Sequence, residues 1–155
     1  MGESAHNENV IKKIKQIGMI VGNLEHSVKA WEAIGIAPWN LHQVGEGFTT
    51  EHVENGLPRD EFKQKYGLCM LDDVQLELIE PRREGDGDYS DFLKLTGGGV
   101  HHLLVEQGPD FEKFISENGI KEIHSFRILR HGKKIAYYDT RELLGVILEV
   151  YVNEG

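Results

Sequence analysis

The chain repeats one order of predicted elements, and this repeat constrains the fold more than any single motif does. An apolar strand over residues 14–21 is followed by an amphipathic helix over 23–34, and a strand over 100–105 is again followed by a helix. Each half then continues through further strands and ends on an alternating strand, VQLELI over 74–79 and GVILEVY over 145–151. Two such βαβββ modules predict an α+β fold in which a curved, open, barrel-like sheet surrounds one cleft.

The second half begins with three glycines over 97–99, followed by Val100 and two histidines. Glycine adopts backbone conformations that other residues avoid, so this run predicts a sharp turn into the strand. Since neighbouring side chains of a strand point to opposite faces, we expect His101 and His102 to face different spaces. We place His102 in a polar cleft, where it would bind a metal ion. The competing interpretation is a histidine that caps the strand or lies on the surface.

The last strand of each half carries one carboxylate on the face opposite its apolar residues. In VQLELI the core face consists of Val74, Leu76 and Leu78, and Glu77 lies on the other face. Glu149 has the same position in GVILEVY. A carboxylate among apolar neighbours costs free energy unless it is solvated or paired. The pattern therefore predicts either an open, wet sheet face or a site.

Four polar residues occupy matching positions in the two halves. Gln16 lies on the first strand of one half and His102 on the first strand of the other, while Glu77 and Glu149 lie on the last strands. Pairing of the two halves brings first and last strands to the cleft floor, so these side chains would converge there. An amide, an imidazole and two carboxylates form an O/N ligand set that suits divalent Ni, Co, Zn or Mn with open positions. Taken alone, Gln16 is better interpreted as a solvated edge residue.

The length of 155 residues fits one domain. We expect a disordered tail over residues 1–10 and a single domain over 11–155, with module one at about 12–81 and module two at about 97–153. The segment 45–60 is rich in Gly, Glu and Asn, which predicts a loop or a mobile lid.

Composition excludes several classes of partner. The formal net charge of −9 repels phosphate backbones, so we expect no nucleic acid partner. The single cysteine, Cys69, forms no disulfide within the chain, which suits a cytoplasmic protein. The sequence has neither an apolar run of membrane-spanning length nor the pattern of a secretory leader at its start, so we expect no membrane partner.

Other polar residues are expected to be solvated. We interpret His42 and His52 as exposed residues near the predicted loop. The basic turn over 130–134 is interpreted as a solvated turn, although its lysines, Lys133 and Lys134, would also suit a phosphate group.

The chain resembles the vicinal oxygen chelate superfamily, which includes glyoxalase I, methylmalonyl-CoA epimerase, bleomycin-resistance proteins and extradiol dioxygenases. The resemblance is carried by KQIGMIVGNLEHSVKAWEAIGIAPW, VQLELIEP, GGGVHHLLVE and YYDTRELLGVILEVY. The segments SDFLKLTGGGVHHLLVE and ELIEP look most like the epimerase branch. The resemblance implies a homodimer and a divalent metal ion held by the following four residues: Gln16, Glu77, His102 and Glu149.

The chain departs from the epimerase pattern at two places. Epimerases of this family usually have His where this chain has Gln16, and Gln at that position is similar to the zinc form of glyoxalase I. Some epimerases also carry a catalytic Glu on the strand before the hairpin turn. Here that strand, over 62–70, has no carboxylate except Glu61 at its edge.

The chemistry that fits these residues is proton abstraction next to a carbonyl group, with a metal-stabilised enolate and Glu149 as the catalytic base. We expect a methylmalonyl-CoA epimerase-like isomerase acting on an acyl-CoA. One alternative is a lactoylglutathione lyase acting on a glutathione hemithioacetal. The other is a non-catalytic protein of the same fold that binds a small molecule.

Overall fold

The computed structural model describes residues 10–43 and 48–155. The tail predicted over 1–10 therefore lies, except for its last residue, outside the described residues. Within these ranges four helices accompany one open sheet of ten strands, and the predicted α+β fold class is confirmed. The strands are β1 (Ile11–Ile20), β2 (Asn40–Gln43), β3 (Thr49–Glu54), β4 (Leu57–Pro58), β5 (Lys65–Leu71), β6 (Val74–Glu80), β7 (Gly99–Gln107), β8 (Glu122–Ile128), β9 (Lys134–Tyr138) and β10 (Ile147–Tyr151). The helices are α2 (Leu24–Ala33), α3 (Gly87–Thr96), α4 (Phe111–Glu117) and α5 (Arg141–Leu144).

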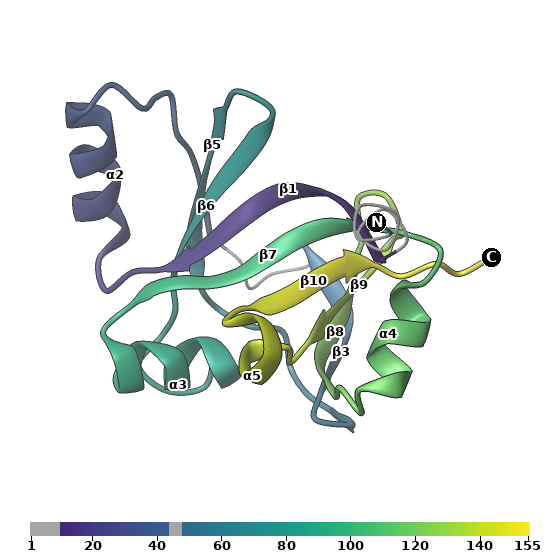
Figure 1. Cartoon of the computed structure of the whole chain (residues 1–155). Helices are drawn as coiled ribbons and strands as arrows, with labels where there is room; N and C mark the ends of the chain where they lie inside the picture. The colour runs from purple at the N-terminus through teal and green to yellow at the C-terminus, as the bar shows by residue number, and fades with distance from the viewer. Residues whose placement is uncertain (1–9, 44–47) are drawn as a thin grey trace.

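The centre of the sheet consists of the first and last strands of both halves, as the repeat predicts. β1 pairs antiparallel with β7, while β6 runs parallel to β1 and β10 runs parallel to β7. The full order is β2-β5-β6-β1-β7-β10-β9-β8-β3-β4. Figure 1 shows these strands as one curved sheet, with α2 beside the β5–β6 end and α4 beside the opposite end. This order places the strands that carry the four candidate ligands side by side.

The segment over 45–60 is not simply a loop, and this part of the prediction is wrong. Apart from residues 44–47, which lie outside the described ranges, it forms the hairpin of β3 and β4. Asn55 and Gly56 both have positive φ (50° and 83°), the pairing that a two-residue hairpin turn requires. β3 pairs with β8, so a hairpin from the first half extends the sheet of the second half.

The first helix ends earlier than its apolar pattern indicates. The side chain of Asn23 caps α2 by accepting a hydrogen bond from the backbone N–H of His26 at 3.0 Å. Leu24 and Val28 are buried against β6. Ile34, the last residue of the predicted helix, is 72% exposed, because the helix has already ended and Ile34 is its C-cap.

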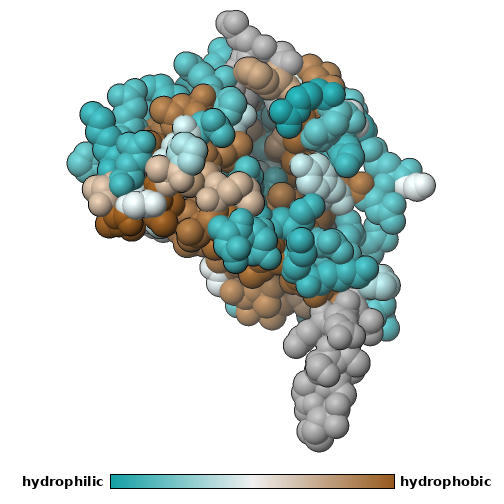
Figure 2. Space-filling model, turned by 90° about the horizontal axis from the view of Figure 1, so that it is seen from above, coloured by the Kyte–Doolittle hydropathy of each residue, from teal (hydrophilic) through white to brown (hydrophobic). Residues whose placement is uncertain are grey.

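Seen from above (Figure 2), hydrophilic side chains cover both halves of the visible face and apolar side chains show between them. None of the helices in the described residues is long and apolar enough to cross a lipid bilayer.

Candidate functional site

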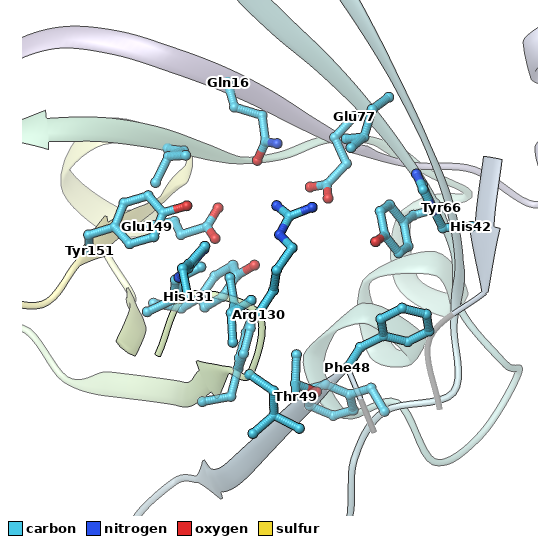
Figure 3. A pocket seen from close by; sticks show the side chains of 18 of the residues that line it. Gln16, His42, Phe48, Thr49, Tyr66, Glu77, Arg130, His131, Glu149 and Tyr151 are labelled. Atoms are coloured by element: carbon cyan, nitrogen blue, oxygen red, sulfur yellow. The ribbon is translucent and has the colours of Figure 1, made fainter. Parts of the chain in front are cut away.

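A cavity of about 690 Å³ lies between the two halves of the sheet (Figure 3). Gln16, Glu77 and Glu149 line it. His102 is fully buried beside them, with its Nε2 atom 3.2 Å from Glu77 Oε1 and 3.4 Å from Glu149 Oε1. The structure thus brings the four residues to one wall of the cavity. That they bind a metal ion stays a prediction.

Gly18 makes room for the His102 ring. It lies on β1 between its cross-strand neighbours Glu77 and His102. A Cβ atom added at this glycine would lie only 2.1 Å from His102 Nε2. A glycine inside an apolar strand often marks such a close approach, and this was the available sequence signal. On the same strand, Gln16 Nε2 donates to Gln75 Oε1 at 2.7 Å, which leaves the Gln16 carbonyl oxygen free of this bond.

The two neighbouring histidines do not face different spaces, and that prediction is wrong. The register between β1 and β7 shifts between the pairs Gly18–His102 and Met19–Val100, which leaves His101 as an extra residue in a β-bulge. A bulge changes the direction of a side chain without ending the strand. Both rings are buried, and their Nδ1 atoms are 2.9 Å apart.

A chain of hydrogen-bonding groups holds the Nδ1 side of the His102 ring. His101 Nε2 lies 2.7 Å from Asp88 Oδ2, and Arg141 donates to both oxygens of Asp88 at 3.1 and 3.2 Å. Burial opposes a charge on Asp88, but its contacts with His101 and Arg141 hold the pKa of Asp88 below its usual value. The ionised carboxylate only accepts hydrogen bonds, so His101 Nε2 carries a hydrogen.

The tautomer of His102 follows from this chain. Burial lowers the pKa of His101, so its Nδ1 atom is an acceptor and His102 Nδ1 donates to it. His102 Nε2 then faces Glu77 and Glu149. Burial also opposes charge on His102, yet its hydrogen bond to Glu77 and the two carboxylates raise its pKa. The position between Nε2 and the two acids therefore requires a positive charge, either a proton or a bound cation.

Glu149 is the most constrained acid of the site. It is 4% exposed, and its Oε1 atom has no hydrogen-bond partner. Burial raises the pKa of Glu149 to about 7, with His102 opposing this shift and Glu77 adding to it. Tyr137 also lines the cavity and forms a hydrogen bond with Glu149.

The donor set fits a divalent cation. Donors held about 2.1 Å from one ion lie roughly 3.0–3.4 Å from each other, and both distances from His102 Nε2 to a carboxylate oxygen fall in this range. The unpartnered Glu149 Oε1 is the atom that a cation would satisfy. In the part of the chain that the structure describes, no group of three or more His, Cys, Asp or Glu side chains is placed so that it could hold a metal ion. The fit to a cation therefore rests on the chemistry of the donors and on the two distances from His102.

A second histidine cluster was not predicted. His52, expected to be solvated, is 6% exposed, and its Nδ1 atom lies 3.4 Å from Nε2 of buried His124. The Nε2 atom of His52 lies 2.7 Å from the hydroxyl of Thr49, which donates to Glu61. This cluster arises because β3 crosses to β8, a pairing that no local pattern indicates. His42 is exposed as expected, but it stacks on Tyr66 and lines the cavity.

The chain is similar in sequence, over almost its whole length, to one curated protein. The chain is 30% identical over 149 residues to the Bacillus subtilis (strain 168) protein YqjC, described as uncharacterized, and the match covers 94% of this chain and 95% of YqjC. No protein-family model matches the chain.

Among solved structures, the chain is similar to methylmalonyl-CoA epimerase from Mycobacterium tuberculosis, with 12% identity, a TM-score of 0.59, and coverage of 92% of this chain and 89% of the epimerase. A variant of the Streptomyces coelicolor epimerase in complex with 2-nitronate-propionyl-CoA has 20% identity and a TM-score of 0.60, over 94% of this chain and 99% of that chain. The hypothetical protein BH1468 from Bacillus halodurans C-125 has 18% identity and a TM-score of 0.57, over 92% and 95% of the two chains. At these identities the likeness shows a common fold.

Proposed function

This chain belongs to the family of the Bacillus subtilis protein YqjC, and from that premise and its epimerase fold we propose that it is a metal-dependent isomerase acting on an acyl-CoA thioester. One observation carries the proposal: an amide, an imidazole and two acids from the four central strands meet on one wall of a cavity. Among the substrates expected from the sequence, an acyl-CoA is the class bound in the Streptomyces structure. The homodimer expected from the resemblance stays a prediction.

Each of the four residues has a defined part. Gln16, Glu77, His102 and Glu149 would hold a divalent cation, which supplies Lewis-acid charge that stabilises the enolate of the substrate. Glu149 lines the cavity and takes the proton next to the carbonyl group, which it would do when its carboxylate is not bound to the cation. The His101–Asp88 chain fixes the ring of His102.

Inversion at the reacting carbon requires a proton donor on the face opposite the base. Figure 3 shows Tyr66 and Glu149 on opposite sides of the cavity, with the Tyr66 hydroxyl pointing inwards. Tyr66 lies on β5, the strand before the hairpin turn, where no carboxylate is available. Burial raises the pKa of this phenol, which therefore keeps its proton at neutral pH. We assign Tyr66 as the donor, and solvent restores both groups after turnover.

The test is solvent deuterium exchange at C2 of methylmalonyl-CoA, measured by NMR with protein loaded with Co, Ni, Zn or Mn. We expect exchange with inversion in the wild type, and loss of both in Glu149→Gln. In Tyr66→Phe we expect exchange to persist while inversion falls at least tenfold, because only the second proton transfer is removed. Absence of exchange with every metal would exclude the epimerase.

Two further measurements separate the alternatives. Calorimetry with the same metals on wild type and Glu149→Gln should show at least tenfold tighter binding by the wild type. Equal, weak binding by both would favour a binding protein without a metal. Turnover of the methylglyoxal–glutathione hemithioacetal, with no exchange on the thioester, would identify a lactoylglutathione lyase instead.

A further inference from the structure

The cavity contains one permanent positive charge that the proposed proton transfer does not use. Among the described residues that line the cavity, Arg130 is the only arginine or lysine. It lies on the turn between β8 and β9, and Figure 3 shows its guanidinium pointing into the cavity, towards the end with Gln16, Glu77 and Glu149. Within the described residues its side chain forms no hydrogen bond or ion pair.

The Arg130 charge acts on two tyrosines that line the cavity. Burial raises the pKa of Tyr66 on β5 and of Tyr151 on β10, and in both phenols the charge of Arg130 opposes this effect. The guanidinium therefore lies near both of these residues, which come from different halves of the sheet. An anion bound by Arg130 would contact the interior of the cavity.

Further basic groups surround Tyr151. The Nζ atoms of Lys15 and Lys133 lie 5.6 and 5.7 Å from the centre of its ring, and the His131 ring lies 6.0 Å away. In a chain with a formal net charge of −9, these groups concentrate positive charge around Tyr151, which lines the cavity. Such a concentration attracts anions into a site that the rest of the surface would repel.

We propose that Arg130 binds an anionic oxygen group of the substrate, a carboxylate or a phosphate. An unpaired guanidinium offers two parallel N–H donors, which match the oxygens of such groups. A divalent cation would balance the charges of Glu77 and Glu149, so the charge of Arg130 remains for the substrate. The distance between the bound anion and the reacting carbon rests on the proposed function. Binding of the anion by Arg130 does not, because it needs no metal.

The first test is a titration that is independent of catalysis. Metal-free protein in a Glu149→Gln background, which removes one repelling charge, is titrated with malonate and with inorganic phosphate and followed by NMR of the arginine side chains. We expect binding of at least one anion, at least tenfold weaker binding in Arg130→Met, and an intermediate affinity in Arg130→Lys. Arg83→Met, which removes an exposed arginine away from the cavity, should bind as the parent does.

The two anions distinguish the sources of the group. Tighter binding of malonate would mean that Arg130 binds a carboxylate of the substrate. Tighter binding of phosphate would mean that Arg130 binds a phosphate group of the substrate. Equal affinities in the parent and Arg130→Met, or no binding of either anion, would overturn the inference. Because this measurement requires no turnover, it stands even if deuterium exchange is absent.

A second test applies where exchange is observed. Arg130→Met should raise the KM for methylmalonyl-CoA at least tenfold and change kcat much less, because the arginine binds the substrate and does not transfer its proton. Binding of propionyl-CoA, which lacks the carboxylate, should change less than twofold if Arg130 holds the carboxylate. An unchanged KM would contradict the assignment.

Discussion

At the scale of single residues, the absence of a side chain at Gly18 is as important as the ligands around it. The His102 ring occupies the space that a Cβ atom would need, and it is fully buried, so it cannot move into solvent. We expect Gly18→Ala to lower the free energy of unfolding by about 1–3 kcal/mol through overpacking. Displacement of His102 should also weaken zinc binding at least tenfold. Denaturant titration and calorimetry measure the two effects.

Gly22 is the matched control for this substitution. It follows the same strand, and a Cβ atom added there would have no neighbour within 4 Å. We expect Gly22→Ala to change neither stability nor zinc affinity appreciably. If Gly18→Ala were as stable as Gly22→Ala and bound zinc as tightly, His102 would not be held by the packing described above.

The sequence indicates which residues the site contains but not how they touch. The repeat groups four residues: Gln16, Glu77, His102 and Glu149. Their strands have equivalent positions in the two halves, and the period-two pattern places all four on the face opposite the apolar residues. The contact between His101 and His102 was missed because a bulge inserts one residue, and a one-residue shift reverses which face a side chain occupies.

At the scale of elements, α3 and α5 help to position His102, a candidate metal ligand that lies on β7. Asp88 of α3 binds His101, and Arg141 of α5 binds Asp88. We expect Asp88→Asn to weaken zinc binding about 10-fold, because the neutral amide fixes the His101 and His102 tautomers less firmly. Nitrogen-15 NMR of the imidazoles should show a mixture of tautomers in the variant and a single form in the wild type.

Asp91→Asn, which alters an exposed acid on the same helix, provides the comparison for this experiment. It should retain the zinc affinity and the single tautomer. A single tautomer in Asp88→Asn as well would mean that Asp88 contributes to stability only and does not position the ligand.

The segment before α3 is held by a buried carboxylate. Asp86 is fully buried and accepts hydrogen bonds from the backbone N–H groups of Lys63 and Arg82 at 3.0 and 2.7 Å, and from the Arg82 guanidinium at 2.9 Å. We expect Asp86→Asn to cost about 3 kcal/mol in denaturant unfolding, because the amide loses the charge that these donors require. Glu84→Gln, which alters an exposed ion pair with Lys94 in the same segment, should be nearly neutral. Similar stabilities of the two variants would refute this account.

At the scale of the whole molecule, the repeat predicts the centre of the sheet and misses its edges. The pairing of β1 with β7 follows from two equivalent halves meeting through their first strands. The pairing of β3 with β8 follows from no repeat, because it depends on which sheet edge is free once both halves have formed. The Asn55–Gly56 turn was a readable hairpin signal, whereas the partner of that hairpin was not. The prediction that His52 is exposed is wrong for the same reason.

This unpredicted junction between the halves makes stability depend on pH. His52 of β3 and His124 of β8 are buried together, His124 is stacked on Tyr137, and burial lowers the pKa of both histidines, that of His124 well below its ordinary value. In the unfolded chain a histidine takes up a proton near pH 6.5. Because the unfolded state then binds more protons, this contribution to stability is complete above about pH 6.5 and is lost as the pH falls below it.

His124→Phe tests this contribution, since phenylalanine preserves the aromatic packing and cannot be protonated. We expect the free energy of unfolding of the wild type, measured with urea, to fall between pH 7 and pH 5. The fall should be clearly smaller in His124→Phe, and it should be unchanged in His26→Gln, which alters an exposed histidine. The slope of the unfolding free energy against pH is compared, because a constant effect of the substitution on packing does not change this slope. Parallel curves for His124→Phe and the wild type would show that protonation of His124 does not contribute to the pH dependence. A reduced slope would mean that the contact joining the two halves is maintained by keeping buried imidazoles neutral.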